Sequence, residues 1–423
     1  MRIAYLSTDF GIPIYGSKGA SIHVREFSRA MTSIGHDVEI ITCRAGGAGP
    51  AGFSVPVHEL PLSKPDKLLF GLLRDDPAAG EPAAREIRSM LYGATIRHLA
   101  LPPLHQFQPD AIYERYALLG TAGGSLARAL GVPHILEVNA PLSEEQASHR
   151  DVAFAQTTRA VEKHMLDAAD RVIAVSEPLK QWMIGIGVDS DRITVLPNGI
   201  DIDRFAVGGA GVRERLGLSA RPVVGFVGTL KSWHGTATLI RAVAMLERER
   251  GDDSAPRLLL VGDGPQRASL EQVAREEGIT GLTTFTGVVP HEAMPAHLAA
   301  MDVAVAPYDQ TGNFYFSPLK LFEYMAAGRP IVAAAIGQIM DFVRDGETGL
   351  LYPPGDIPAL ASRLAQLLDN PTRAQALGRA AQHEARLHRS WEGNARMVVQ
   401  LVRAEQAPAG LARPTGVLTE GIR

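Results

Sequence analysis

A lysine and a glutamate stand three residues apart in the segment SPLKLFEYMAAGRP, residues 317–330. On a helix, Lys320 and Glu323 share one face. Lys320 would lie in the first turn, where a cation opposes the helix dipole by roughly 0.3–1 kcal/mol unless an anion binds there. Backbone N–H groups, a serine hydroxyl and a lysine at a helix start favour phosphate, and the glutamate can accept hydrogen bonds from sugar hydroxyls. The alternative is a surface Lys–Glu pair on an ordinary helix.

The same segment predicts where this helix begins and ends. Ser317 is typical of an N-cap, and Pro318 is typical of the first helical position. Gly328 and Pro330 stop the helix, which makes it about three turns long. Its apolar positions fall on one face, which we expect to pack on the core: Leu319, Phe322 and Met325 or Ala326.

The loop GIPIYGSKGASIHVREF, residues 11–27, is a second candidate for ligand contact. Gly16 and Gly19, just before a predicted helix, would let the backbone approach a sugar or a diphosphate closely. The spacing is not the G-x-G-x-x-G of a dinucleotide fingerprint, and an ordinary turn between a strand and a helix is the alternative. His23, in the first turn of the predicted helix, either reaches the ligand or lies on the surface.

Polar side chains also follow two predicted strands, in YERYALLG (113–120) and EVNAPLSEEQ (137–146). Because the carboxyl ends of parallel strands open at one edge of a sheet, we expect these side chains to face one cleft. The candidates for contact with an acceptor or a sugar are Arg115, Glu137, Asn139 and Glu144.

The elements that would position these residues alternate between short apolar strands and amphipathic helices. Strands are predicted near residues 2–7, 37–43, 111–113, 133–138 and 171–175, and in a second series near 223–229, 257–262, 283–287, 303–308 and 330–335. This rhythm predicts an α/β chain whose parallel sheets are covered on both faces. Two such series indicate two doubly wound, Rossmann-like domains with a ligand cleft between them.

The domain boundaries are predicted from turn residues and the restart of the strand series. The first domain is expected at 1–198, joined by a C-terminal helix near 391–405, and the second at 199–390. The segments 44–58 and 61–82, rich in glycine, proline and alanine, are predicted as loops.

Composition excludes several classes of protein. The 423 residues include 42 Lys and Arg against 46 Asp and Glu, and this net charge of −4 argues against binding to nucleic acid. Cys43 is the only cysteine, which excludes an intrachain disulfide and a cysteine-based metal site. No signal peptide and no apolar run of membrane-spanning length is found, so we expect a cytoplasmic protein. The mildly basic helix predicted at 84–100 leaves peripheral contact with a membrane open.

Asp201 and Asp203 form a D-x-D pair, and two carboxylates at this spacing can bind a divalent cation. Here the pair ends a turn after Gly199, and aspartate beside glycine is typical of turns. A helix start with a lysine can neutralise a leaving phosphate without Mg²⁺. We therefore expect no metal site.

Five further stretches stand in a fixed order around the Lys320–Glu323 segment. They are LPNGIDIDRF (196–205), VGTLKSWHG (227–235), LLLVGDGPQRASLEQVA (258–274), FTGVVPHEAMPAHLAAMDVAVAPY (285–308) and DGETGLLYPPGD (345–356). Together with SPLK-x-x-EYMA-x-G-x-P, they resemble the motifs of the family 4 retaining glycosyltransferases (group 1, glycogen-synthase-like). The resemblance is close over 196–390 and loose before it. It implies the GT-B fold, with an N-terminal acceptor-side domain and a C-terminal nucleotide-sugar-binding domain.

The resemblance also implies roles residue by residue. The catalytic residues would be Lys320, Glu323, Lys231 and His234, with the lysines on the diphosphate and Glu323 on the ribose. The donor-binding residues would be Gly16, Gly19, Gly228, Thr229, Gly262, Gly264, Thr286, Gly287, Val288, Phe316, Ser317, Pro318 and Leu319.

This chain departs from the family pattern at three positions. Tyr315 stands where the family often has a glutamate that contacts the sugar. Thr229 and His234 stand where the family usually has Arg and Lys, so that Lys231 and Lys320 would supply the positive charge. His234 would be partly charged near neutral pH unless a phosphate raises its pKa, or it is an ordinary exposed loop histidine.

The function implied is transfer of a hexosyl or N-acetylhexosaminyl group from a UDP- or GDP-linked donor to an acceptor hydroxyl, with retention of configuration. The acceptor would be a glycan, a lipid-linked sugar or a small molecule, and the reaction would need neither a cofactor nor a metal ion. Two other enzyme classes remain as alternatives, a sugar-nucleotide epimerase and a phosphorylase on the same fold. Tyr315 and Thr229 also leave open a degenerate glycan-binding protein.

Overall fold

The computed structural model describes residues 1–149, 151–218, 221–251, 254–309 and 317–407. The chain divides into two compact units. The N-unit comprises Met1–Asn198 and the segment that begins at Trp391, and the C-unit comprises Gly199–Ser390. Each unit holds one parallel sheet, so the predicted α/β class with two parallel sheets is confirmed.

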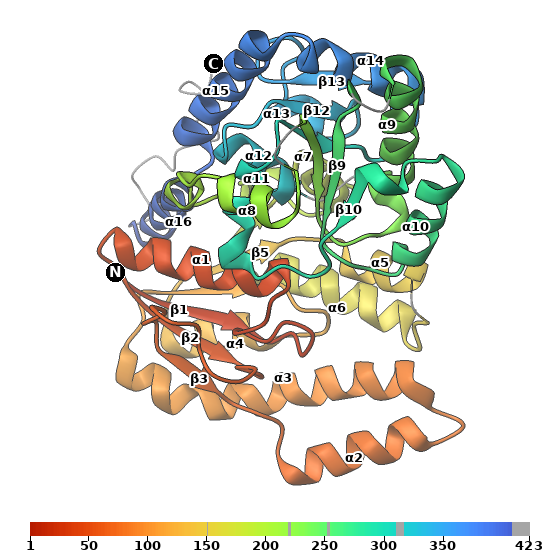
Figure 1. The fold of residues 1–423 in the computed structure, drawn as a ribbon. Coiled ribbons are helices and arrows are strands. Elements are labelled where there is room, and N and C mark those ends of the chain that lie inside the picture. Colours follow the sequence, from red (N-terminus) through yellow and green to blue (C-terminus); the bar gives the residue numbers. More distant parts are fainter. Residues whose placement is uncertain (150, 219–220, 252–253, 310–316, 408–423) are drawn as a thin grey trace. The chain divides into compact units, whose positions relative to one another are not determined.

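The N-unit is built on a sheet with the strand order β3-β2-β1-β4-β5-β6-β7 (Figure 1). Its strands are β1 (Arg2–Ser7), β2 (Asp37–Thr42), β3 (Val57–Glu59), β4 (Ala111–Arg115), β5 (His134–Val138), β6 (Arg171–Ala174) and β7 (Ile193–Val195). Every pairing between them is parallel. The strand order reverses between β1 and β4, and open α/β sheets bind ligands at the carboxyl ends of the strands at such a switch point.

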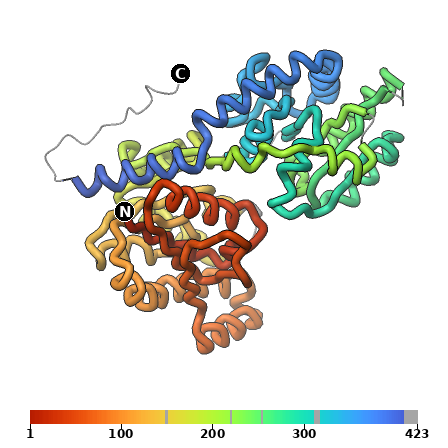
Figure 2. The backbone as a smooth tube through the Cα atoms, turned by 60° about the vertical axis from the view of Figure 1, so that its left-hand side comes forward, coloured from red at the N-terminus to blue at the C-terminus, as the bar shows by residue number. Residues whose placement is uncertain are grey.

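Helices cover both faces of this sheet, because successive residues of a strand point to opposite sides. Helices α1 (Gly19–Ser33) and α16 (Trp391–Gln406) lie side by side on the face that carries Tyr5 (Figure 2). Helices α3 (Gly80–Phe107) and α4 (Ala122–Leu130) pack on the face that carries Leu6. The other helices of the N-unit are α2 (Lys64–Asp75), α5 (Leu142–His149), α6 (Ala155–Ala168) and α7 (Glu177–Gly185), with a 3₁₀ turn at Ser190–Arg192.

Helix α2 occupies most of the segment 61–82 that was predicted as a loop, so that prediction is wrong. Ser63 caps the helix by accepting a hydrogen bond from the Asp66 N–H at 3.2 Å, and Pro65 stands in the first turn. The helix has no fully buried residue. Its apolar side chains therefore do not mark a core-facing stripe, and the helix is recognised by its cap rather than by burial.

The C-unit has a sheet with the strand order β10-β9-β8-β11-β12-β13, again parallel throughout. Its strands are β8 (Val223–Val227), β9 (Arg257–Val261), β10 (Thr283–Phe285), β11 (Val303–Ala306), β12 (Ile331–Ala334) and β13 (Leu350–Tyr352). Its helices are α8 (Ala210–Arg215), α9 (Thr236–Arg250), α10 (Arg267–Glu276), α11 (Met294–Ala299), α12 (Leu319–Ala326), α13 (Ile339–Phe342), α14 (Ile357–Leu368) and α15 (Pro371–His388). Its 3₁₀ turns include Asp203–Phe205, Ser232–His234, Thr280–Leu282 and His291–Ala293. The strand order reverses between β8 and β11, which is the switch point of this unit.

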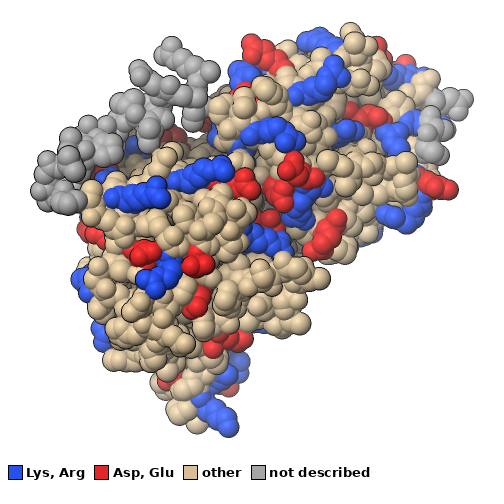
Figure 3. Space-filling model, turned by 90° about the vertical axis from the view of Figure 1, so that its left-hand side faces the viewer, with Lys and Arg blue, Asp and Glu red and all other residues tan. Residues whose placement is uncertain are grey.

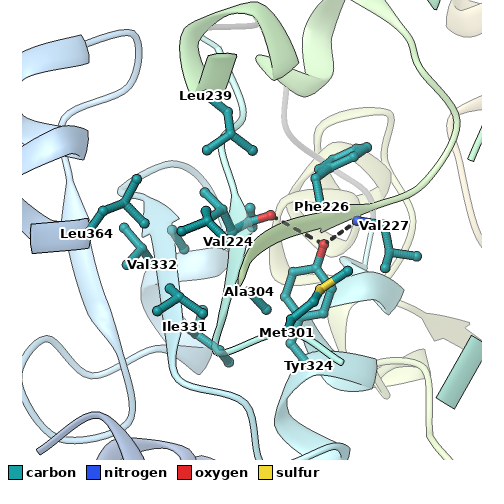
Figure 4. Close-up of a cluster of buried hydrophobic side chains, with 14 of the residues drawn as sticks. Val224, Phe226, Val227, Leu239, Met301, Ala304, Tyr324, Ile331, Val332 and Leu364 are labelled. Carbon is teal, nitrogen blue, oxygen red and sulfur yellow. Dashed lines mark hydrogen bonds between the residues drawn. The ribbon is translucent and has the colours of Figure 1, made fainter. Parts of the chain in front are cut away.

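A single buried cluster forms the core of the C-unit. Leu239 of α9 and Leu364 of α14 lie on one side of the sheet, and Met301 and Tyr324 lie on the other (Figure 4). Met301 fills the space that the missing side chain of Gly225 leaves, since a Cβ there would lie 2.2 Å from the Met301 Sδ. This packing fixes the ends of β8 and β11 against α12.

Charged side chains of both signs are interspersed on the face drawn in Figure 3, and neither sign forms a continuous field there. This distribution agrees with the net charge of −4. Among the helices of the described residues, none is both long and apolar enough to cross a membrane.

Candidate active site

The helix that carries the lysine and the glutamate is α12, and it is shorter than predicted. It has eight residues, with Pro318 in the N-cap position and no side-chain hydrogen bond at the cap. Ser317 is therefore not the N-cap, and Pro318 is not the first helical residue, because its φ of −81° and ψ of 76° lie outside the helix. The Leu319 N–H donates to the Ser317 carbonyl at 3.0 Å. Tyr315 and Phe316 lie outside the described residues.

The ammonium group of Lys320 lies among aromatic rings. Its Nζ is 4.4 Å from the centroid of the Phe226 ring and 4.9 Å from that of Tyr308, and a Cβ added at Gly228 would lie 3.0 Å away. Nζ is buried and has no hydrogen-bond partner among the described residues. Burial lowers the pKa of Lys320 to about 7, against the opposing effect of Glu323. A buried cation without an acceptor is unfavourable despite its aromatic contacts, so this position suits an anion.

Glu323 follows one turn further along α12. Burial raises its pKa to about 7, although the charges of Lys320 and Arg204 act to lower it. At neutral pH the carboxyl group is therefore divided between its protonated and ionised forms. It can donate as well as accept a hydrogen bond, which suits a pair of sugar hydroxyls.

Tyr324 fixes α12 to the sheet at the switch point. Its hydroxyl accepts a hydrogen bond from the Val227 N–H at 2.9 Å and donates one to the Val305 carbonyl at 3.2 Å (Figure 4). Val227 ends β8 and Val305 lies in β11, so one buried side chain ties the helix to both strands. Because Tyr324 follows Lys320 by one helical turn, these bonds set the position of Lys320 above the strand ends.

Glycines bring the loops after β8 and β9 into direct backbone contact. A Cβ added at Gly262 would lie 2.1 Å from the Gly228 carbonyl oxygen, and one added at Gly264 would lie 2.6 Å from that of Leu230. The Gly228 N–H donates to the Val261 carbonyl at 2.9 Å, which holds the two loops together. Packing alone therefore accounts for Gly262 and Gly264, and their contact with a donor stays a prediction.

The residues predicted after β10 lie beside these glycines. The Gly262 N–H donates to Thr286 Oγ1 at 3.4 Å, and Gly262 forms an isolated β-bridge with Gly287. Val288 is 78% exposed, which is unusual for a valine and leaves its surface available. The three predicted positions 286–288 thus lie at the carboxyl edge of the C-unit sheet.

The loop after β8 carries Thr229, Lys231 and His234 to the same place. The His234 ring centroid lies 5.7 Å and 5.5 Å from those of the two aromatic rings under Lys320, and Lys231 Nζ lies 4.5 Å from the centroid of Trp233. Burial lowers the pKa of His234 to about 3, and the charges of both lysines act in the same direction. His234 is thus neither an exposed loop histidine nor a cation at neutral pH. Its Nδ1–H donates to the Thr229 carbonyl at 2.5 Å, so Nε2 presents a lone pair.

In the N-unit, four of the five predicted acceptor-side residues meet around Glu137. Its Oε2 accepts a hydrogen bond from His23 Nε2 at 3.0 Å. Its Oε1 accepts bonds from Arg115 Nη1 at 3.0 Å and Asn139 Nδ2 at 2.5 Å, and the Tyr113 hydroxyl donates to Oε2. Burial alone would raise the pKa of Glu137, but the charges of His23 and Arg115, together with the hydrogen bonds from His23 and Tyr113, lower it to about 2. This carboxylate is fully satisfied by the protein itself.

One alternative for the acceptor-side residues is wrong, and one predicted residue lies apart from the others. His23 lies in the second turn of α1 and is 3% exposed, so its placement on the surface is wrong. Its ring packs against Trp391 at 4.7 Å between centroids. Glu144 does not join the cluster around Glu137, because it lies exposed on α5 and accepts a hydrogen bond from Trp182 Nε1 at 2.8 Å.

The glycine loop after β1 is held down from within the N-unit. Arg25 of α1 donates from Nη1 to the carbonyls of Ile14 at 2.5 Å and Gly16 at 2.8 Å. A Cβ added at Gly16 would lie 2.8 Å from Ser21 Oγ, so the tight turn itself requires a glycine. Gly19 is exposed at the start of α1. The ordinary strand-to-helix turn therefore remains an alternative to a ligand role for both glycines.

Asp201 and Asp203 lie in the turn that leads into the C-unit. Asp203 begins a 3₁₀ turn and accepts a hydrogen bond from Arg386 Nη1 at 3.3 Å. In the described ranges, no three His, Cys, Asp or Glu side chains are grouped as metal ligands.

Sequence reasoning missed three residues that shape this site. Phe226 and Tyr308 form the aromatic floor under Lys320, and Arg204 acts on Glu323. Phe226 lies in an apolar strand and is indistinguishable from a core residue by composition. Its position at the end of β8, beside the switch point, was the available signal.

Two doubly wound parallel-sheet units in one chain define the GT-B class of glycosyltransferase folds. The HepE protein of Anabaena, solved in complex with UDP-glucose, has this fold with a TM-score of 0.69. It is 20% identical to this chain, and the match covers 96% of this chain and 100% of that one. The predicted GT-B fold is therefore confirmed.

The sequence comparisons identify the family. Residues 17–204 match Glycosyltransferase Family 4, and residues 221–370 match the Glycosyl transferases group 1 family. The chain is 33% identical to the D-inositol 3-phosphate glycosyltransferase of Corynebacterium urealyticum, over 77% of this chain and 81% of that protein. It is 27% identical to the glycogen synthase of Mycobacterium tuberculosis, over 95% of this chain and 94% of that protein. The chain belongs to family 4 of the glycosyltransferases, and it is an enzyme that transfers a sugar.

Proposed function

We propose that this enzyme transfers a hexosyl or N-acetylhexosaminyl group from a UDP- or GDP-linked donor to an acceptor hydroxyl, with retention of configuration and without a metal ion. The observation that carries this proposal is the ammonium group of Lys320. It is buried at the switch point of the C-unit, it touches two aromatic rings, and it has no hydrogen-bond acceptor among the described residues. A diphosphate would supply the missing acceptor and the opposite charge.

The hard step of glycosyl transfer is the departure of the nucleoside diphosphate. Negative charge grows on the β-phosphate, and a fixed cation aimed at it is worth roughly 2.7–4 kcal/mol if its loss compares with that of an oxyanion-hole donor. Lys320 supplies this charge, with Lys231 in support. The amides of 317–319 were expected to help, but Pro318 has no N–H and that of Leu319 donates to Ser317. The electrostatic role therefore falls more heavily on the lysines.

The remaining donor contacts follow from the chemistry of each group. Glu323, near the midpoint of its titration at neutral pH, holds the ribose hydroxyls. The main chain at 285–288 meets the base. His234 acts as a neutral hydrogen-bond acceptor through Nε2 and receives a sugar hydroxyl rather than a phosphate oxygen. The departing phosphate takes the proton of the attacking acceptor hydroxyl on the same face of the sugar, which retains the configuration.

The test is incubation of the full-length enzyme with UDP- and GDP-sugars, with and without a panel of hydroxyl acceptors. Transfer, or slow hydrolysis without acceptor, supports the proposal, and NMR of the anomeric proton reads the configuration of the product. Isomerisation of the donor would support an epimerase, and phosphorolysis of a glycan would support a phosphorylase. Binding without any turnover would indicate a degenerate glycan-binding protein.

Variants of α12 test the assigned roles. We expect Lys320→Ala and Glu323→Ala each to lower kcat/KM at least tenfold, a loss of roughly 1.4 kcal/mol or more. Lys67→Ala, an exposed lysine of α2, is the control. Wild-type kinetics in both α12 variants would end the assignment of this helix to the donor.

A further inference from the structure

A cavity of about 250 Å³ lies at the carboxyl ends of β1 and β4 in the N-unit. One wall is the face of α3 that runs from Arg85 to Ile96, and the opposite wall consists of the loops after β1 and β4. The cavity therefore opens at the switch point of this sheet, where doubly wound folds bind ligands. It is separate from the cluster around Glu137, whose residues do not line it.

Two arginines, one helical turn apart on α3, line this cavity. Arg88 lies over the rings of Phe10 and Phe70, with its guanidinium carbon 4.3 Å and 4.8 Å from their centroids. Arg85 donates from Nη2 to the Asp151 carbonyl at 3.1 Å. The Nε atoms of both arginines are buried without a hydrogen-bond partner, as far as the chain is described. Burial also lowers the pKa of Arg88, which reflects the cost of holding its charge there.

The carboxylates in the cavity wall make their hydrogen bonds elsewhere, and the charge of Asp9 opposes only part of the effect of burial on Arg88. Glu86 accepts hydrogen bonds from the N–H groups of Ala153 at 3.0 Å and Phe154 at 2.9 Å. Asp9 accepts one from the Gly11 N–H at 2.7 Å. Among the described residues, no salt bridge joins a carboxylate to either arginine of the cavity; the partner found for Arg85 is the Asp151 carbonyl, and the Nε atoms of both arginines lack one.

Two further polar groups in the wall also lack partners. Thr8 Oγ1 and Gln146 Oε1 are buried and make no hydrogen bond to any described residue. Buried polar groups are normally paired, so four such atoms around one cavity indicate that something absent from the chain itself pairs with them. Two guanidinium groups beside a hydroxyl are typical of binding to a phosphate or a carboxylate.

We propose that this cavity binds an anionic group, phosphate above all, of the acceptor substrate, with Arg85 and Arg88 as its charged donors. The inference rests on the proposed function, because it names the substrate class of the same enzyme. The cavity has the volume of about eight water molecules at roughly 30 Å³ each, which suits a sugar or polyol phosphate of monosaccharide size. Arg85 and Arg88 position the acceptor and take no part in the departure of the donor phosphate.

The first test uses inorganic phosphate as the probe. The full-length enzyme is saturated with the nucleoside diphosphate that stabilises it, so that the donor site is filled, and phosphate is then added while the melting temperature is measured. We expect phosphate to raise the Tm of the wild type and of Arg97→Gln, an exposed arginine on the same helix. We expect no such rise for Arg85→Gln or Arg88→Gln. An equal rise in all four proteins, or no rise in the wild type, would overturn the proposal.

The second test compares acceptors as phosphorylated and phosphate-free pairs: glucose 6-phosphate with glucose, myo-inositol 3-phosphate with myo-inositol, and vesicles that contain phosphatidylinositol with vesicles that contain a neutral glycosyldiacylglycerol. We expect transfer to prefer the anionic member at least tenfold in kcat/KM, and Arg88→Gln to raise the acceptor KM at least tenfold while donor hydrolysis stays within twofold of the wild type. Soluble acceptors would assign the anion to a free phosphate, and vesicles alone would assign it to a lipid headgroup. Equal use of neutral partners refutes the anionic acceptor.

The two proposals fail in different ways. If no nucleoside diphosphate binds and no nucleotide sugar is hydrolysed, the proposed function is wrong. If the donor is bound and hydrolysed but Arg88→Gln leaves every acceptor KM unchanged, only the inference about the cavity is wrong. Arg88→Lys, which keeps the charge, should recover part of the acceptor affinity, whereas a variant that merely disturbs packing on Phe10 and Phe70 would not be rescued.

Discussion

Replacing Lys320 by methionine should stabilise the C-unit relative to the wild type, and this gain in stability should be larger at pH 6 than at pH 9. Burial lowers the pKa of Lys320 from 10.5 to about 7 in the folded protein. A lowered lysine pKa destabilises the fold fully below pH 7, and this penalty fades as the pH rises from 7 toward 10.5. Each pH unit between 7 and 9 lowers this free-energy penalty by about 1.36 kcal/mol, so that over the two pH units it falls by roughly 2–3 kcal/mol. Lys320→Met carries no such penalty, so its advantage over the wild type should shrink by that amount.

Differential scanning calorimetry measures this effect directly. For a unit of this size, roughly 2–3 kcal/mol corresponds to a change of about 5–10 °C in Tm. Glu323 could add to the effect, because the loss of Lys320 removes a charge that lowers its pKa. The comparison is therefore repeated in a Glu323→Gln background. Lys67→Met, at an exposed position, is the control and should show no pH-dependent difference. If the difference in Tm between Lys320→Met and the wild type is also independent of pH, the ammonium is not a buried, uncompensated charge.

Three further predictions concern the glycine loops, the acceptor side and metal ions. Gly262→Ala should lower the Tm by several degrees and weaken binding of nucleoside diphosphates, because its Cβ would lie 2.1 Å from the Gly228 carbonyl oxygen, whereas Gly281→Ala has nothing within 4 Å and should behave as the wild type. Glu137→Gln should lower the Tm at pH 7, and this loss of Tm relative to the wild type should become smaller as the pH falls from 4.5 through 2. The reason is that Glu137, whose pKa is lowered in the fold, stabilises the fold only while it is ionised. A loss of Tm that does not change with pH would contradict this role of the carboxylate. EDTA should leave transfer intact, and strong inhibition that Mg²⁺ reverses would show a metal requirement.

The parallel-sheet architecture was predictable because its strands are short, apolar and separated by helical patterns. The runs at 2–7, 223–229 and 303–308 became β1, β8 and β11 with small shifts of their ends. Strands of three residues carry few positions to show a pattern, and three of the four described strands of that length, β3, β7 and β13, were not predicted, whereas β10 was. Helix α2 was missed for a different reason, since it buries no residue and its cap was its main signal.

The candidate site was predictable in residue identity but not in electrostatic state. The sequence indicates that Lys320 and Glu323 lie on one face of a helix, but it cannot show that a phenylalanine of β8 and a tyrosine from the segment just after β11 lie against the ammonium. His234 could be placed in the loop after β8, but only the structure shows burial beside two lysines, which makes it neutral. The N-cap prediction failed because the ψ of Pro318, 76°, lies outside the helical region, so that the helix begins one residue later, at Leu319.

The buried charged groups of this enzyme are of two kinds: those that the chain itself pairs and those that it leaves without a partner. We assign the first kind a structural role and the second kind a role in ligand binding. Glu137 is surrounded by four donors of its own chain, and its lowered pKa reports a charge that the fold stabilises. Lys320 and Arg88 have lowered pKa values instead, and their buried nitrogen atoms lack partners within the described chain. A fold that satisfies one buried carboxylate so completely could have paired these cations as well. That it leaves them unpaired, each at the switch point of its own sheet, is why we assign one cation to the phosphates of the donor and the other to an anionic acceptor.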